Sequence, residues 1–248
     1  MSNLVVAIVP AAGQGARMGS HTPKQYLTLG EIPILVYSLQ ILQQVPDIHQ
    51  IILSVPDRDR EFCRQEIVQA HHLSKVSQVI AGGRRRQDSV RHGILAISSL
   101  PEIVVVHDGV RPFIHEQMVK DVIASARRVG GAVAAMPIHD TVKRVGSDGL
   151  IQETLKREEL WQVQTPQAFR YDWLREGHRR AQEENWDVTD DASIIERMGY
   201  PVSVVEGSCL NIKITKPEDL ILGKAIGQVW ETQVIGEKAG ELGKDRIV

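Results

Sequence analysis

The sequence predicts an α/β fold: a Rossmann-like, mostly parallel sheet with helices on both faces and a projecting β-hairpin arm. Three observations lead to this class. Short runs of apolar residues recur along the chain, segments with helical periodicity separate them, and the alternation is interrupted once, after Pro137. Short runs without polar positions are typical of strands that are buried on both faces of a sheet.

The apolar runs are predicted to be buried strands, and the periodic segments between them are predicted to be helices. The strands are expected at residues 4–9, 51–55, 76–80, 103–106 and 132–136, and the helices at 34–42, 58–70, 87–97 and 117–128. This alternation favours a parallel sheet, in which ligands bind beyond the carboxyl ends of the strands. The loops after Val9, Ile80 and Val106 are therefore the predicted functional loops.

The pattern changes after Pro137. Segments 139–144 and 150–154 flank Gly146-Ser147-Asp148-Gly149, a composition typical of a turn, so we expect a hairpin arm at about residues 138–158. Later in the chain, helices are expected at 171–184, 190–198 and 217–229, and strands at 202–205 and 212–214. We interpret residues 1–230 as a single domain and residues 231–248 as a loose polar tail.

Composition restricts the class of protein. The chain has 248 residues, of which 42% are hydrophobic, enough to bury one sizeable core. Its formal net charge of -2 does not indicate a nucleic-acid partner, which would favour a clearly basic domain. Cys63 and Cys209 are too few for a disulfide scaffold, and no apolar run reaches membrane-spanning length. We expect a cytoplasmic protein with reduced thiols and no membrane partner.

The loop after the first strand reads Pro-Ala-Ala-Gly-Gln-Gly-Ala-Arg-Met-Gly, from Pro10 to Gly19. Alanine and glycine let a backbone approach a ligand closely, and successive loop N–H groups can hold phosphates. The third glycine comes one residue late for a dinucleotide-binding fingerprint, and the Lys-Ser/Thr of a P-loop is missing. A tight turn without a ligand stays an alternative. Arg17 and Lys24 either neutralise a triphosphate here or are solvated surface charges.

Two further loops carry polar groups. Residues 81–90 contain two glycines, three arginines and Ser89, which suits either a nucleotide contact or an ordinary turn before an N-capped helix. Asp108 follows a buried strand, where it is well placed to bind a divalent metal directly or through water, and Arg111 can bind a phosphate. The sequence lacks the ligand spacing of a zinc site and the Gly-x-Ser-x-Gly elbow of a hydrolase.

Taken together and in order, these loops and several later segments resemble the 2-C-methyl-D-erythritol 4-phosphate cytidylyltransferases of the non-mevalonate isoprenoid pathway. The matching segments are PAAGQGARM, PKQY, AGGRRRQDSV, HDGVRP, HDTVKR, LWQVQTPQAF, TDDAS, VEGSCLNIKIT and KPEDL, which extend from Pro10 to Leu220. The resemblance implies an enzyme that joins CTP and 2-C-methyl-D-erythritol 4-phosphate and releases pyrophosphate. It also implies Mg²⁺ or another divalent cation, and a homodimer in which the arm reaches the partner's site.

The resemblance further assigns roles to individual residues. Nucleotide binding would fall to Ala11, Ala12, Gly13, Gly83, Arg84 and Ser89; catalysis to Arg17, Lys24 and Lys213; and acceptor binding to Asp108, Arg111, Thr141, Arg157 and Thr165, with Asp108 also near the metal.

The acceptor alcohol has an alternative. The family often has His-Asp-Ala-Ala-Arg-Pro where this chain has Gly109 and Val110. The related ribitol 5-phosphate cytidylyltransferases share the CTP motifs and can carry valine at this position. Residues 141–144 and Arg157 favour methylerythritol phosphate. A non-catalytic nucleotide-binding protein is the alternative from a different class, and it would bind CTP without releasing pyrophosphate.

Overall fold

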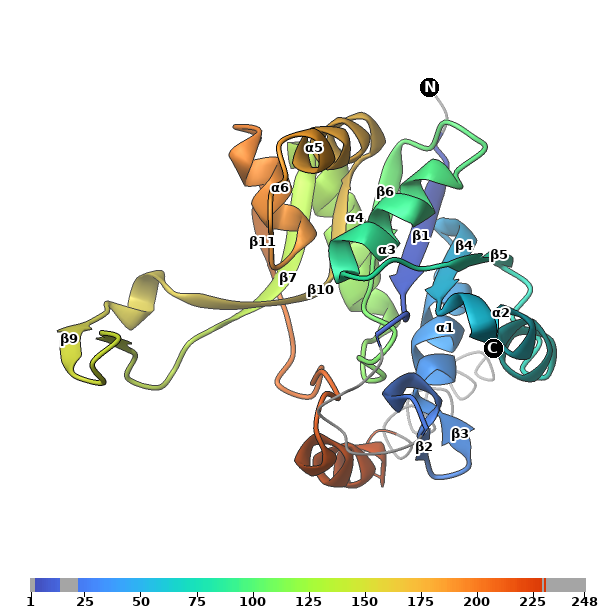
Figure 1. Cartoon of the computed structure of the whole chain (residues 1–248), viewed down its shortest axis with the longest axis horizontal. Helices are drawn as coiled ribbons and strands as arrows, with labels where there is room; N and C mark the ends of the chain where they lie inside the picture. Colours follow the sequence, from blue (N-terminus) through green and yellow to red (C-terminus); the bar gives the residue numbers. More distant parts are fainter. Residues whose placement is uncertain (1–2, 14–21, 229, 231–248) are drawn as a thin grey trace, which may run out of the picture.

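The central sheet has the strand order β11-β7-β10-β6-β1-β4-β5 within residues 3–13, 22–228 and 230, which the computed structural model describes (Figure 1). Its strands are β1 (Val5–Pro10), β4 (Ile48–Val55), β5 (Val76–Ala81), β6 (Ile103–Val106), β7 (Gly131–Pro137), β10 (Trp161–Arg170) and β11 (Ser203–Glu206). Strands β5, β4, β1 and β6 pair in parallel, as do β7 and β11, whereas β10 is antiparallel to both β6 and β7. The predicted fold class is confirmed.

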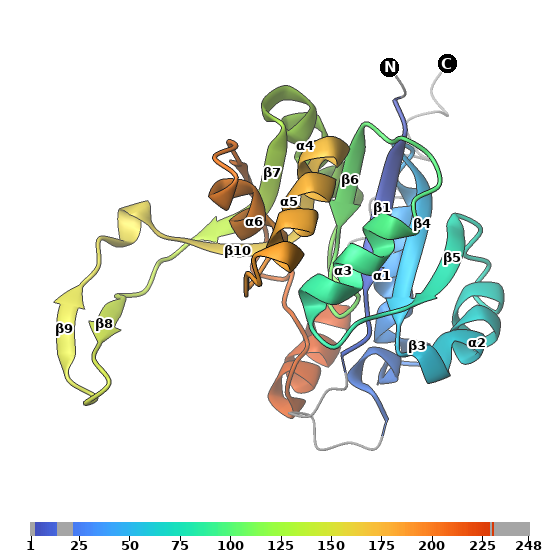
Figure 2. The same cartoon turned by 45° about the horizontal axis from the view of Figure 1, so that its top comes forward.

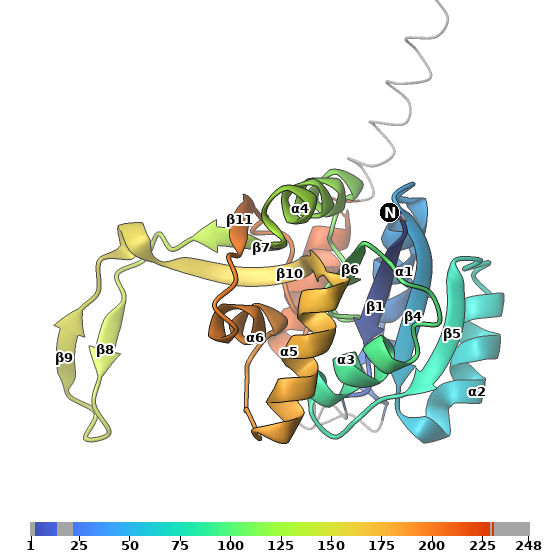
Figure 3. The same ribbon diagram turned by 90° about the horizontal axis from the view of Figure 1, so that it is seen from above.

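Helices cover both faces of this sheet (Figure 3). The chain forms α1 (Ile34–Gln44), α2 (Arg60–Phe62) with the π-helical η4 (Cys63–Gln69), α3 (Arg86–Leu95), α4 (Glu116–Val129), α5 (Tyr171–Glu183) and α6 (Asp191–Arg197). Alternation along the strands divides the core: Val5, Ala7 and Val9 of β1 pack with α1, η4 and α4, whereas Ile8 packs with α3, α5 and α6. Helix α4 ends at Gly130, whose φ of 105° favours glycine.

The order of the strands creates a crevice beside β1. The chain runs from β1 to β4 and β5 on one side, then returns to β6 on the other side of β1. Loops leaving the carboxyl ends of β1 and β6 therefore diverge, which is where open α/β sheets bind their ligands.

Two predictions about strands need correction. Strand β10 was not predicted, because Pro166 lies in its middle and proline removes a ladder hydrogen bond. The pairing register with β7 shifts between Val163 and Gln167, and this bulge accommodates the proline. The predicted strand at 212–214 is wrong, since this segment has no regular secondary structure. Ile214 is instead fully buried, and its N–H donates to the Val110 carbonyl at 2.9 Å.

The predicted hairpin arm is present. Strands β8 (Lys143–Val145) and β9 (Ile151–Thr154) pair antiparallel in a two-stranded sheet of their own, which projects from the main sheet (Figure 2). The first strand begins later than expected, and all residues of both strands are exposed. The predicted tail at 231–248 lies outside the described residues. Among the helices that are described, none is long and apolar enough to cross a membrane.

Candidate active site

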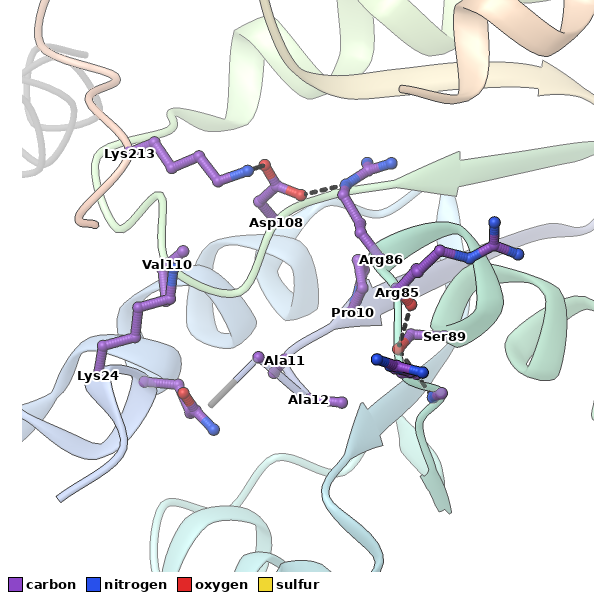
Figure 4. Close-up of a pocket in the computed structure, with 14 residues that line it drawn as sticks. Pro10, Ala11, Ala12, Lys24, Arg85, Arg86, Ser89, Asp108, Val110 and Lys213 are labelled. Carbon is purple, nitrogen blue, oxygen red and sulfur yellow. Dashed lines mark hydrogen bonds and ion pairs between the residues drawn. The ribbon is translucent and has the colours of Figure 1, made fainter. Parts of the chain in front are cut away.

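Two adjoining pockets open at the carboxyl ends of β1 and β6. The first, which we call the β1 pocket, has a volume of about 530 Å³, and the second, the β10 pocket, about 730 Å³. Arg86, Asp108 and Lys213 line both pockets, so these side chains form the junction between them (Figure 4).

The β1 pocket is shaped by close contact between two loops. The Ala11 N–H donates to the Ser54 carbonyl at 2.7 Å, which holds the first loop against β4. A Cβ atom on Gly82 would lie 2.3 Å from the Cβ of Ala12, so the second loop approaches this closely only because residue 82 is glycine. Ser89 Oγ accepts the Gly83 N–H at 3.0 Å and fixes the turn before α3.

Lys24 reaches the same pocket from the short helix η2 (Lys24–Tyr26). A Cβ atom on Gly13 would lie 4.0 Å from the Cε of Lys24, which places this side chain over the first loop. Tyr26 anchors the turn: its hydroxyl is 3.2 Å from Asp59 Oδ2 and 3.2 Å from Cys63 Sγ. Burial raises the pKa of Tyr26 well above its usual value, so the phenol keeps its proton for this anchor.

Removal of the Tyr26 hydroxyl is expected to lower kcat through Lys24. Tyr26→Phe keeps the ring, which packs edge-on to Phe62 at 5.2 Å between centroids, but it loses the link to Asp59. If Lys24 has the catalytic role that the resemblance implies, kcat should fall about tenfold, because misplacing such a group costs activity steeply. Steady-state kinetics and thermal unfolding of the variant check this.

Tyr37→Phe is the matched control, because Tyr37 donates to the Leu29 carbonyl at 2.8 Å and lines neither pocket of the site. Tyr26→Phe loses the hydroxyl contacts with Asp59 and Cys63, and Tyr37→Phe loses the hydrogen bond to the Leu29 carbonyl; each hydrogen bond is worth about 1 kcal/mol of stability. Equal kcat values for the two variants would exclude a specific effect of Tyr26 on Lys24.

Asp108 is the centre of the junction. Its side chain is 7% exposed, with Oδ1 2.7 Å from Arg86 Nε and Oδ2 2.7 Å from Lys213 Nζ. Burial by itself would raise the pKa of Asp108, but the charges of Arg86 and Lys213 outweigh it and hold the pKa well below the usual value. This carboxylate is therefore ionised at neutral pH and orients two cations.

A chain of hydrogen bonds fixes the backbone at Asp108. The His107 Nε2 atom lies 3.1 Å from the Arg111 carbonyl, which only accepts, so this nitrogen carries the proton. Burial lowers the pKa of His107 to about 4, so the ring is neutral at pH 7 and its Nδ1 is an acceptor. The Thr165 hydroxyl donates to that Nδ1 at 3.1 Å and accepts the Asp108 N–H at 3.0 Å.

Lys213 arrives from a segment without regular structure that is tied to both neighbours. Arg111 Nη1 donates to the Asn211 carbonyl at 2.7 Å, and Asn211 Nδ2 donates to the Thr165 carbonyl at 2.9 Å. Thr165 lies in the bulge of β10, which turns it towards Asp108. This segment has no regular secondary structure, and through Asn211 it contacts both the loop after β6 and the bulge of β10.

The structure brings most of the residues proposed from sequence together. The β1 pocket is lined by Ala11, Ala12, Gly13, Lys24, Gly83, Arg84, Ser89, Asp108 and Lys213, and the β10 pocket by Asp108, Arg111, Thr165 and Lys213. Thr141 and Arg157 line neither pocket: both are exposed at the arm, where Arg157 Nη1 donates to the His139 carbonyl at 2.7 Å. Arg17 lies outside the described residues.

Sequence reasoning missed Arg86 and Asp191. The run of three arginines did not reveal which of them faces the site, and the assignment went to Arg84 alone. Arg86 is the first residue of α3 and contacts Asp108, whereas Arg84 is exposed at the pocket's edge. Asp191, in the Thr-Asp-Asp-Ala-Ser motif, holds the other end of Arg86. Its only signal in the sequence was membership of that motif.

The residues that line the pockets are better suited to a metal ion bound mainly by substrate phosphates than to one bound by protein side chains alone. The described residues contain no group of three or more His, Cys, Asp or Glu side chains that would bind a metal ion. Asp108 is the acidic residue among those lining the β1 pocket, and both of its oxygens already contact cations. Mg²⁺ usually keeps several waters and takes substrate phosphates as ligands, which is compatible with one carboxylate reached through water.

Comparison with known proteins agrees with this geometry. The family model of IspD, 2-C-methyl-D-erythritol 4-phosphate cytidylyltransferase, matches residues 5–228. A protein of that name from Syntrophus aciditrophicus is 51% identical over 225 residues, covering 91% of this chain and 96% of the relative. Another from Geobacter metallireducens is 44% identical over 224 residues, covering 89% of this chain and 96% of the relative.

Solved structures give the same result. The crystal structure of 4-diphosphocytidyl-2C-methyl-D-erythritol synthase from Anaerococcus prevotii superimposes with a TM-score of 0.81 at 30% identity, covering 91% of this chain and 96% of that one. The 2-C-methyl-D-erythritol 4-phosphate cytidylyltransferase from Thermus thermophilus gives 0.73 at 32% identity, covering 90% and 98%. Because the family model matches residues 5–228 and a relative is 51% identical over 91% of the chain, the chain belongs to the IspD family of 2-C-methyl-D-erythritol 4-phosphate cytidylyltransferases.

Proposed function

We propose that this chain joins CTP and 2-C-methyl-D-erythritol 4-phosphate to give 4-diphosphocytidyl-2-C-methyl-D-erythritol and pyrophosphate. The observation that carries the proposal is the meeting of two pockets at Asp108, Lys213 and Arg86. A reaction between two phosphorylated substrates needs two compartments with cations where they meet. The names of the relatives favour methylerythritol phosphate over ribitol 5-phosphate as the acceptor.

The reaction needs little acid–base chemistry. The acceptor's phosphate oxygen attacks the α-phosphorus of CTP in line, a new P–O bond forms, and the bond to pyrophosphate breaks. The attacking phosphate is largely ionised near neutral pH because its second pKa is about 6. The protein's task is therefore to position two anions and to neutralise their charge.

The β1 pocket suits the nucleotide. Backbone from Ala11 to Gly13 lies beside Lys24, and Arg86 and Lys213 add positive charge at the inner end. Lys24 would stabilise the negative charge that develops on the leaving pyrophosphate, and Lys213 would contact the phosphates from the acceptor side. Arg17 belongs to the same first loop and is proposed to act with Lys24 on the triphosphate.

Mg²⁺, or another divalent cation, would neutralise part of the negative charge of the CTP triphosphate. Asp108 is the proposed contact for this ion, through water, because its own oxygens are held by Arg86 and Lys213.

The β10 pocket suits the acceptor. Arg111 and Lys213 supply donors for its phosphate, and Thr165 lines the same pocket and holds the Asp108 backbone beside it. Asp190 and Glu196 also line this pocket and can accept from hydroxyl groups. Arg111 is mostly buried and already tied to Asn211, so it contributes a fixed positive charge beside the phosphate more than a mobile clamp.

We further propose a homodimer in which the arm of one subunit reaches the site of the other. A two-stranded ribbon is only marginally stable alone, and this one exposes Val145, Leu150 and Ile151 by 53%, 67% and 65%. Trp161 and Val163, on the strand that leaves the arm, are 43% and 42% exposed. Such an apolar surface is typical of an interface. Thr141 and Arg157 would then contact the partner's acceptor.

Mixing two variants, of which Lys24→Ala should lower kcat and Arg157→Ala should mainly weaken acceptor binding, tests the shared site. In a crossed dimer of Lys24→Ala and Arg157→Ala subunits, one site carries both changes and the other carries neither. Random exchange should therefore restore about a quarter of wild-type activity, given a two-fold dimer. Each variant incubated alone under the same conditions is the control. Activity that stays at the level of the separate variants after exchange, followed by mass spectrometry, would rule out shared sites.

An assay of pyrophosphate release tests the reaction itself. CTP with 2-C-methyl-D-erythritol 4-phosphate should give fast release and a product whose mass equals both substrates less pyrophosphate. Faster release with ribitol 5-phosphate would transfer the assignment to that acceptor. Binding of CTP without release of pyrophosphate in the presence of either acceptor would favour the non-catalytic alternative. A cytoplasmic location is proposed with the function, in keeping with the free thiols of Cys63 and Cys209.

A further inference from the structure

A buried chain of charged groups leads from the junction to a helix pair outside both reactive loops. Arg86 Nε contacts Asp108 Oδ1 at 2.7 Å, while its Nη1 contacts Asp191 Oδ2 at 2.7 Å. Asp191 Oδ1 in turn lies 2.9 Å from His178 Nε2 on α5. The side chains of Asp191 and His178 are 1% and 2% exposed, so both are almost inaccessible to solvent.

We infer that Asp191, held by His178, is a positioning residue that directs the Arg86 guanidinium to Asp108, and so keeps Arg86 and Lys213 at the junction where phosphoryl transfer occurs. The inference rests on the proposed function and extends it to two residues outside the reactive loops. Asp191 touches neither pocket. It acts through Arg86, which lines both.

The ionic state of Asp191 follows from its contacts. Burial would raise the pKa of this carboxyl, but Arg86 and a hydrogen bond from His178 lower it below its usual value. An ionised carboxylate only accepts, so the His178 Nε2–H donates. The two Asp191 oxygens are thus fixed by different partners, and the side chain has a single orientation.

Packing of α6 does not require this ion pair. Ala192 and Ile195 of α6 belong to the same apolar cluster as Val90 and Ile94 of α3. Gln87 separately connects α3 to the segment that precedes α6, since its Nε2 donates to the Trp186 carbonyl at 2.9 Å. Buried ion pairs often stabilise no better than apolar side chains of the same size. What Asp191 adds is the direction of the guanidinium.

The charges at the junction support the same conclusion. Arg86, Arg111 and Lys213 surround Asp108, and Asp191 is the second carboxylate that contacts this group. Without it, a buried Arg86 would have Asp108 as its one anionic partner among the described residues, and would compete with Lys213 for it. With it, Arg86 spans two carboxylates and Lys213 keeps its own oxygen.

Asp191→Asn is the direct test, because asparagine has the same shape without the charge. Partners that orient metal ligands typically contribute about 10–100-fold. By analogy we expect kcat to fall about tenfold, with the KM for CTP changed by less than about twofold. Asp172→Asn is the matched control: Asp172 lies in the first turn of α5 and pairs with Arg170 at 2.7 Å, away from both pockets. This control should keep wild-type kcat.

A double-mutant cycle separates positioning from general stability. If Asp191 acts through Arg86, then Asp191→Asn should cause no further loss of kcat in an Arg86→Ala background. Full additivity of the two losses would overturn the inference. If Asp191→Asn does not fold, His178→Gln serves instead, with a smaller loss of kcat that also vanishes in the Arg86→Ala background.

A crystal structure of Asp191→Asn, or of His178→Gln, gives a result that does not depend on turnover. We expect the Arg86 guanidinium to shift on Asp108 and to displace Lys213 Nζ from Oδ2, because Asp108 becomes the one carboxylate that Arg86 contacts among the described residues. Unchanged contacts at Asp108 would overturn the inference even if the wild-type enzyme were inactive towards CTP and methylerythritol phosphate. Inactivity of the wild-type protein, by contrast, would refute only the proposed function.

Discussion

Lys24→Ala is expected to lower kcat by about 10²–10³-fold while the fold stays intact, because one preorganised charge at a reacting phosphate typically contributes that much. The structure places Lys24, which is half-buried, on a short turn over the first loop of the β1 pocket. Its loss leaves no cavity in the core, so thermal unfolding should change little. Single-turnover measurements of pyrophosphate release, at saturating concentrations of both substrates, give the comparison.

Lys120→Ala is a suitable control for Lys24→Ala. Lys120 pairs with Glu116 at 2.6 Å on the outer surface of α4 and lines neither pocket. The two variants lose the same formal charge, so a general effect of net charge would reduce both rates equally. A Lys24→Ala enzyme with near-normal kcat would remove this residue from the mechanism.

Asp108→Asn is expected to have an effect on kcat as large as that of Lys24→Ala, and a clear effect on stability as well. The change removes the negative charge that holds Arg86 and Lys213, each at 2.7 Å. We expect kcat to fall about 10²–10³-fold. Stability should fall by roughly 3 kcal/mol, because breaking a buried ion pair costs about that much and Arg86 then contacts Asp191 as its one remaining carboxylate among the described residues.

The stability loss of Asp108→Asn also has a pH dependence. The pKa of Asp108 is lower in the folded protein than in the unfolded chain, so its ionised form stabilises the fold above the unfolded pKa. This contribution is lost as the pH falls towards the folded pKa. The difference in unfolding free energy between wild type and variant should therefore be largest near pH 7 and shrink in acid. Asp47→Asn, which breaks the surface pair with Arg127 at 2.8 Å, is the control and should cost little at any pH.

The sheet and its functional loops were predictable because their signals are local. Apolar runs such as Leu4–Val9 and Ile103–Val106 have no polar position, and helical periodicity separates them, so alternation alone led to the correct class. The site residues at the ends of those strands followed, since parallel strands bring their carboxyl ends to one edge.

Features that depend on distant contacts were not predictable in this way. Strand β10 contains Pro166, and only its bulge explains how a proline fits there. Ile212 and Ile214 resemble a strand because they are apolar, but their side chains pack in a separate apolar cluster that includes Phe113. Arg86 and Asp191 are 105 positions apart in sequence, and no local pattern connects them.

The arm shows which part of the proposed assembly could be predicted from the sequence and which could not. Its turn was evident from the Gly and Asp residues, and the structure confirms the hairpin. In the proposed dimer a second molecule covers its apolar side chains, and the sequence and fold of one chain do not contain that contact. The shared-site experiment addresses this directly.

A crystal structure of the protein with CTP and Mg²⁺ tests the central claim most directly. The account requires the triphosphate to lie in the β1 pocket, with Lys24 on the phosphates and Lys213 facing the α-phosphate from the β10 pocket. A nucleotide bound elsewhere, or one whose α-phosphate points away from Lys213 with the β10 pocket sealed off, would contradict the account.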